Sequence, residues 1–167
     1  MRLEHWLAII VPIAIAILGA ISRFLWRHFR RDKNIVRFQV EFEEAEDPKW
    51  IEKFYRIKKQ TDKIVWGLDD AIRSKSVELE LAALDKAVNE LPPLIQELEA
   101  LPLPKSKRAR QAFSYYVSGL ATYLLACRYF KTGFEQDDEE AAKEGARQIK
   151  IACELMDKSF LLSKKGK

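Results

Sequence analysis

Histidine and cysteine are scarce in this 167-residue chain, which contains two of each. Two cysteines cannot build a disulfide scaffold. Both histidines, His5 and His28, flank an apolar run near the N-terminus, so the rest of the chain has no imidazole for catalysis or metal binding. The Glu-x-x-His pairs of di-iron bundles are also absent. We therefore expect a protein that is not an enzyme, with no catalytic residues, no metal site and no cofactor.

Glycine and proline are equally sparse, with six of each. This composition excludes collagen-like and low-complexity chains, and no glycine-rich loop that could hold a phosphate is present. Hydrophobic residues make up 48% of the chain and charged residues 32%. Such a chain is long enough for one domain of ordinary size.

An excess of one sign of charge is lacking outside the N-terminal region. Residues 1–33 contain six Lys or Arg and two Asp or Glu, whereas residues 34–167 contain 23 of each sign, so the net charge of +4 belongs to the first segment. Positive charge beside an apolar run is typical of a membrane protein. We therefore expect the lipid bilayer as a partner and no binding to nucleic acid.

A single long apolar run extends from Trp6 to Ser22 (WLAIIVPIAIAILGAIS) without a charged residue. As a helix it would measure about 26 Å, or about 31 Å if continued to Trp26. The hydrocarbon core of a bilayer is about 30 Å thick. The sequence therefore predicts a transmembrane anchor with a basic flank in residues 1–33, and its membrane-interface residues are Trp6, Arg23, Trp26, Arg27, Arg30, Arg31 and Lys33.

Two alternatives compete with an uncleaved anchor. Ala20-Ile21-Ser22 offers the small residues that a signal peptidase requires, although the basic cluster that follows opposes export. A buried soluble helix is the other alternative. With an anchor, the positive flank places the C-terminal domain in the cytoplasm, and we expect a single-pass protein of the inner or plasma membrane.

Residues 34–47 (NIVRFQVEFEEAED) have an ambiguous pattern. Apolar and polar residues alternate from Val36 to Glu43, as in a strand, but no second strand is evident to pair with it. Ile35, Phe38 and Phe42 also fit one face of a helix. We interpret this segment as a helical or irregular linker, with a strand paired across a dimer as the alternative.

Residues 48–163 carry apolar stripes at helical spacing, and residues 164–167 form a basic tail. Asp47-Pro48 starts the first helix, and Ser74 or Ser76, Ser106, and Asp137 or Asp138 cap the next three. We expect Pro92-Pro93 to kink or break the second helix, and Gly133 to close the third. The fold class predicted is all-α: an N-terminal transmembrane helix followed by an antiparallel up-and-down bundle of about four long, coiled-coil-like helices.

A basic run, Lys105, Lys107, Arg108 and Arg110, lies at the start of the third helix, where the helix dipole disfavours cations by about 0.3–1 kcal/mol each. In an up-and-down bundle this run returns to the end that faces the membrane. We therefore interpret it as a contact for anionic lipid or a protein partner. A merely solvated turn is the alternative, and so is pairing with the acidic residues 41–47.

The two cysteines and the aromatic residues of the third helix are interpreted as parts of the core of the bundle. Cys127 and Cys153 are expected to lie about 15 Å apart along the helix axes, too far for a disulfide. The aromatic residues of the third helix are interpreted as core, with a ligand pocket as the alternative: Phe113, Tyr115, Tyr116, Tyr123, Tyr129 and Phe130.

These expectations lead to a hypothesis: a membrane-anchored helical bundle that binds an unidentified protein partner or acts as a scaffold, without catalysis. A ligand-binding sensor or transport-related accessory subunit with an exported bundle is the alternative. A homo-oligomeric assembly is a third.

Overall fold

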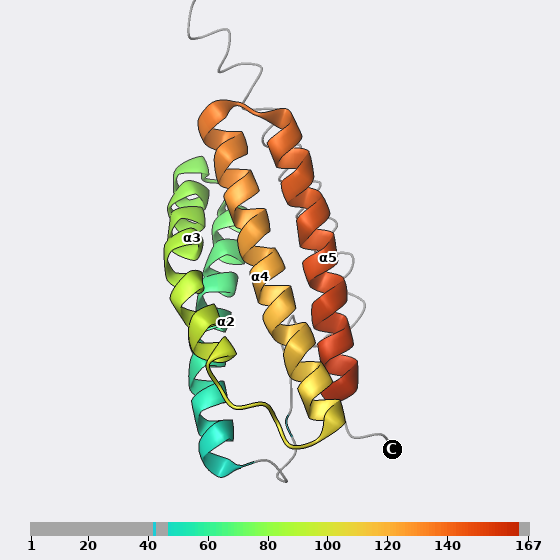
Figure 1. Ribbon diagram of the computed structural model, residues 1–167. Helices are drawn as coiled ribbons and strands as arrows, with labels where there is room; N and C mark the ends of the chain where they lie inside the picture. The colour runs from blue at the N-terminus through green and yellow to red at the C-terminus, as the bar shows by residue number, and fades with distance from the viewer. Residues whose placement is uncertain (1–41, 43–46, 164–167) are drawn as a thin grey trace, which may run out of the picture.

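The computed structural model describes residue 42 and residues 47–163 of the chain, and all four elements in this part are α-helices. They are α2 (Pro48–Ser74), α3 (Val77–Glu99), α4 (Lys107–Gln136) and α5 (Glu139–Ser163). Successive helices run up and down side by side, with the start of α2 and the start of α4 at the same end (Figure 1). The predicted helical bundle is confirmed for these residues.

The transmembrane prediction concerns residues 1–33, which lie outside the described residues together with most of the linker and the basic tail. The membrane-interface residues Trp6, Arg23, Trp26, Arg27, Arg30, Arg31 and Lys33 are all in that part. Among the helices that the structure describes, none is both long enough and apolar enough to cross a membrane. Residue 42 and residues 47–163 also contain no strand.

The helix starts follow the predicted caps. The Asp47 carboxylate accepts a hydrogen bond from the Lys49 amide at 2.8 Å, and Pro48 occupies the first helical position. The α2 stripe is buried throughout, as its spacing predicts: Trp50, Phe54, Ile57, Thr61, Ile64, Leu68 and Ala71. Ser76, Ser106 and Asp138 accept capping hydrogen bonds at the starts of α3, α4 and α5.

Of the predicted kink or break at Pro92-Pro93, the break is wrong, because α3 continues through both prolines to Glu99. Each proline removes one amide donor from the helix. However, Pro93 is exposed and Pro92 is half-buried, so water can reach this side of the helix. Buried Leu91, Leu94 and Leu98 pack into the core on both sides of the pair. Tertiary packing therefore holds the helix together where local preference opposes it.

The end of α4 also differs from the prediction, since the helix continues past Gly133 to Gln136. Asp137 then caps it in the left-handed conformation, with φ 53°. Gly133 has a packing function instead. A Cβ atom there would lie 3.2 Å from the Ala142 Cβ and 3.1 Å from the Asp138 carbonyl.

Helices α4 and α5 form the most extensive contact in the bundle, because small residues line it. A Cβ atom at Gly145 would lie 3.0 Å from the Phe130 ring, and one at Gly119 would lie 2.9 Å from Met156. The Ser159 hydroxyl donates a hydrogen bond to the Ala112 carbonyl at 2.7 Å. By contrast, α2 contacts mainly α3, and α3 contacts mainly α2 and α4.

Aromatic rings fill the core near the start of α2. Phe42 packs edge-on against Trp50 and Phe54, with ring centroids 4.8 Å apart in both pairs. Phe113 and Tyr116 of α4 complete the cluster. The interpretation of the α4 aromatics as core is confirmed for Phe113, Tyr116 and Phe130, which are buried, whereas Tyr115, Tyr123 and Tyr129 are half-buried.

Candidate interaction surfaces

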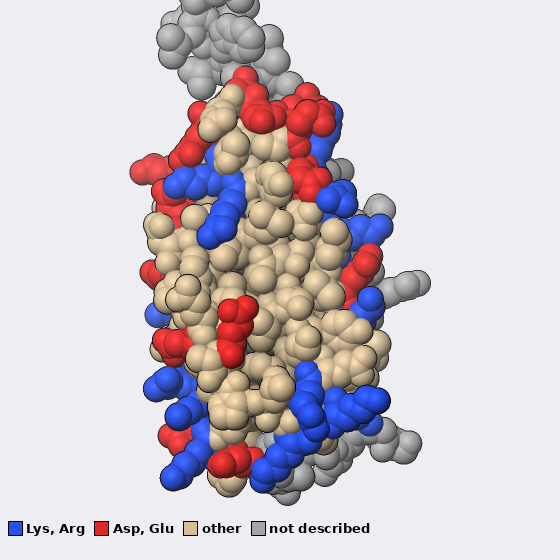
Figure 2. Space-filling view, in the orientation of Figure 1, with Lys and Arg blue, Asp and Glu red and all other residues tan. Residues whose placement is uncertain are grey.

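The basic run lies in and after the loop that joins α3 to α4, at the end of the bundle where α2 begins (Figure 1). Its four members, Lys105, Lys107, Arg108 and Arg110, are all exposed. Figure 2 shows Lys and Arg gathered at this end and Asp and Glu gathered at the opposite end. The two ends of the bundle therefore differ in the sign of their charge.

Arg108 has a structural role that the sequence did not reveal. Its Nε donates a hydrogen bond to the Leu162 carbonyl at 2.6 Å, in the last turn of α5. The final carbonyl groups of a helix lack partners within the helix, and they form the negative end of its dipole. The end of α5 therefore compensates for the unfavourable position of this cation at the start of α4. The sequence pattern alone gives no reason to distinguish Arg108 from the other three cations.

Arg110 also contributes to local structure, because its Nη2 donates a hydrogen bond to the Lys105 carbonyl at 3.0 Å. This hydrogen bond joins the first turn of α4 to the loop residue that precedes the Ser106 cap. Among the four residues, Arg108 and Arg110 thus hold the loop and the end of α5, and their exposed guanidinium groups still add charge to the surface. The lysines at 105 and 107 place their charges at the same end.

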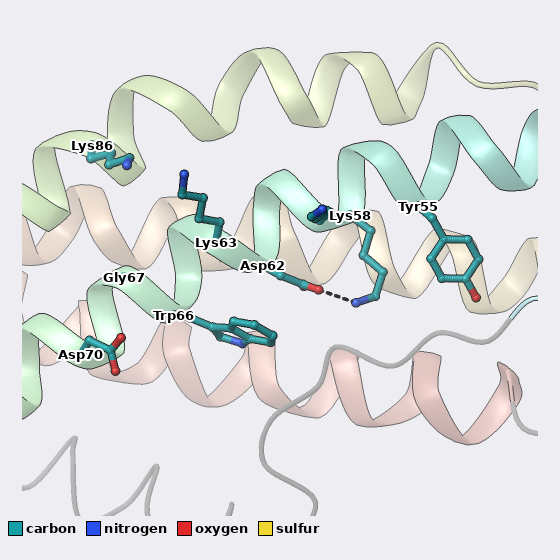
Figure 3. A pocket seen from close by; sticks show the side chains of 9 residues that line it. Tyr55, Lys58, Asp62, Lys63, Trp66, Gly67, Asp70 and Lys86 are labelled. Atoms are coloured by element: carbon teal, nitrogen blue, oxygen red, sulfur yellow. Dashed lines mark hydrogen bonds and ion pairs between the residues drawn. The ribbon is translucent and has the colours of Figure 1, made fainter.

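A second surface, which was not predicted from the sequence, follows the outer side of α2. A groove of about 590 Å³ is lined by eight residues of α2 and one of α3 (Figure 3): Tyr55, Lys58, Lys59, Asp62, Lys63, Trp66, Gly67, Asp70 and Lys86. We call it the α2 groove. The signal available in the sequence was a second stripe with a spacing of three to four residues, formed by Tyr55, Lys58, Asp62 and Trp66.

An ion pair forms part of the floor of the α2 groove. The Lys58 ammonium lies 2.6 Å from Asp62 Oδ2, and the two side chains are only 9% and 13% exposed. Burial raises the pKa of Asp62, although its hydrogen bond to Lys58 and the charge of that residue lower it. The other carboxylate oxygen, Oδ1, is buried and has no hydrogen-bond partner.

Aromatic side chains flank this ion pair on the same side of α2 (Figure 3). Tyr55 is 37% exposed and Trp66 is 44% exposed, so both rings keep part of their apolar surface at the surface of the bundle. Gly67 widens the groove, because a Cβ atom at this position would meet nothing within 4 Å. The arrangement combines apolar surface, a buried acceptor and a basic border.

Two observations on the described residues concern metal binding and thiol chemistry. No group of three or more His, Cys, Asp or Glu residues within residue 42 and residues 47–163 is arranged to hold a metal ion. Both cysteines are free thiols, and burial raises the pKa of Cys127 and of Cys153 to about 12. Such thiols are poor nucleophiles at neutral pH.

Comparison of the chain with protein-family models, curated proteins and solved structures found no match.

Proposed function

We propose that this protein is a single-pass membrane protein whose cytoplasmic helical bundle serves, without catalysis, as a protein interaction module or scaffold. The anchor is the apolar run from Trp6 to Ser22, with its basic flank. The bundle begins at Pro48, so a linker of about 14 residues (34–47) separates the two parts. Any interaction with a partner then takes place close to the membrane surface.

One observation carries this proposal: the end of the bundle at which α2 begins also holds the basic run (Figure 2). A chain that leaves the bilayer before α2 brings this end closest to the lipid headgroups. Each cation near an anionic leaflet contributes about 1 kcal/mol of attraction. The acidic end, with Asp137, Glu139 and Glu140, points away. The charge distribution of the bundle thus supports a membrane-proximal base.

The anchor can be tested by extraction of native membranes with alkaline carbonate. We expect the full-length chain to stay in the membrane pellet and an Ile13→Lys/Ile17→Lys variant to be released, because a charged side chain near the bilayer centre opposes insertion. The matched control is Ile35→Lys, outside the apolar run, which should stay in the pellet. Release of the unmodified chain would refute the anchor.

The orientation needs a separate test. A reporter fused to the C-terminus, active only in the cytoplasm, is expected to be active. An inactive cytoplasmic reporter, together with activity of a reporter that works only after export, would refute the cytoplasmic bundle and favour the sensor or accessory-subunit alternative.

A further inference from the structure

We propose that the α2 groove binds an amphipathic helix of a partner protein, one with an apolar stripe flanked by carboxylates. The inference rests on the proposed function as an interaction module and names its docking surface. It is independent of the anchor, because the groove lies wholly on α2 and α3.

The dimensions of the groove suit a helix. It extends along α2 from Tyr55 to Asp70, which corresponds to about 23 Å, or roughly four helical turns. The described part of the chain offers no strand edge to an extended peptide, and the groove runs alongside helices. Docking of an apolar helix face into such a groove is a common mode of peptide recognition.

Apolar contacts come from Trp66 and Tyr55. Large aromatic side chains of this kind dominate the binding free energy of many protein interfaces, where their rings become fully buried. Trp66 and Tyr55 are separated by about three turns of α2 and point to the same side of it (Figure 3). Two side chains of the partner at a spacing of about seven to eleven residues would meet them.

The lysines that border the α2 groove determine which charge on a partner helix is favoured. Lys59 and Lys63 of α2 and Lys86 of α3 line the groove, and none of them forms an ion pair with a residue that the structure describes. Lys58 is already neutralised by Asp62. Asp70 is the remaining carboxylate of the lining, so the border attracts an acidic flank and repels a basic one.

A synthetic peptide can test the charge rule on the full-length chain in lipid nanodiscs. The probe is a fluorescein-labelled helical peptide of about 18 residues with a leucine stripe and glutamates on its flanks. The control peptide has lysine in place of every glutamate. We expect fluorescence anisotropy to show binding of the acidic peptide and at least about tenfold weaker binding of the basic one. Equal binding of both peptides, or no binding of the acidic one, would overturn the proposal.

Variants of the chain locate the binding site. Lys63→Glu/Lys86→Glu should weaken the acidic peptide at least about tenfold, and Trp66→Ala should weaken it to a similar extent. The matched control, Arg128→Glu/Lys150→Glu, makes the same change of charge at exposed positions of α4 and α5 and should alter the dissociation constant less than about twofold. Equal weakening by the control pair would mean nonspecific attraction and would overturn the proposal.

The natural occupant can be identified with a photo-crosslinker in native membranes. Gly67→p-benzoylphenylalanine would place the reactive group where even a Cβ atom meets nothing within 4 Å. A crosslink to an acidic amphipathic segment of another protein, lost in Lys63→Glu/Lys86→Glu, supports the proposal. A crosslink to residues 34–46 of the same chain, to a second copy, or to nothing overturns it. Carbonate extraction of the same membranes reports on the anchor separately.

Discussion

The Thr61 hydroxyl and the Tyr116 phenol lie 3.0 Å apart in the fully buried interior and join α2 to α4. Thr61 uses its own hydrogen to donate to the Lys58 carbonyl at 2.8 Å. Tyr116 must therefore be the donor between the two hydroxyls. Burial raises the pKa of Tyr116, so the phenol keeps its proton across the physiological range.

This donor direction predicts unequal effects of two conservative substitutions. Tyr116→Phe should destabilise the bundle by about 1 kcal/mol, because Thr61 retains its bond to Lys58. Thr61→Val should cost about 1–3 kcal/mol, because it leaves the buried phenol without an acceptor. Chemical unfolding of the full-length chain in detergent, followed by circular dichroism, measures both values. A larger loss for Tyr116→Phe would contradict the assigned direction.

A buried carboxylate makes stability depend on pH. Glu80 of α3 is only 4% exposed, its Oε2 is buried without a partner, and burial raises its pKa to about 7. The folded state therefore holds the Glu80 proton more tightly than the unfolded state does. The stability that this proton contributes is fully present below pH 4.5 and is lost as the pH rises through about 7.

Glu80→Gln should consequently stabilise the bundle at pH 8 by about 1–3 kcal/mol, at about 1.4 kcal/mol per pKa unit, and by much less at pH 5. The measurement is the free energy of unfolding at the two pH values. Glu78→Gln, at an exposed position in the same turn, is the control. A gain that does not depend on pH would mean that the Glu80 carboxyl titrates in its ordinary range.

Two glycine substitutions should change stability in opposite directions. Gly67→Ala adds a methyl group in open space on an exposed helix face and should stabilise the bundle by about 0.5–1 kcal/mol through helix propensity. Gly145→Ala gains the same propensity but forces the new methyl group against the buried Phe130 ring. We expect a net loss of about 0.5–2 kcal/mol from overpacking. The measurement is the thermal unfolding temperature of each variant compared with that of the unmodified chain. Stabilisation by Gly145→Ala would refute the close α4–α5 contact.

Helix positions and the core of α2 could be predicted from the sequence because they depend on local rules. The stripe from Trp50 to Ala71 keeps one spacing, and each start carries a recognisable cap. The ends and interruptions depend on packing instead. Pro92-Pro93 remains helical because leucines on both sides are held in the core, and Gly133 lies against Ala142 rather than ending α4.

The surfaces were harder to predict. Lysines and aspartates on α2 have the pattern of a solvated helix face, and only the fold reveals that Lys58 and Asp62 are buried together. The role of Arg108 depends on the end of α5, 54 residues along the chain. Contacts between elements distant in sequence decide both cases, and a pattern within one helix carries no information about them.

The orientation of the bundle on the membrane tests the proposed function most directly. In a Cys127→Ala/Cys153→Ala background, a fluorophore is attached at Lys107→Cys in the basic run or at Glu140→Cys, near the start of α5 at the opposite end of the bundle. The full-length chain is reconstituted in vesicles containing anionic lipid and a lipid with a nitroxide on its headgroup. We expect strong quenching of the label at position 107 and little quenching of the label at position 140. Equal quenching at both positions, or stronger quenching at position 140, would contradict a membrane-proximal basic end.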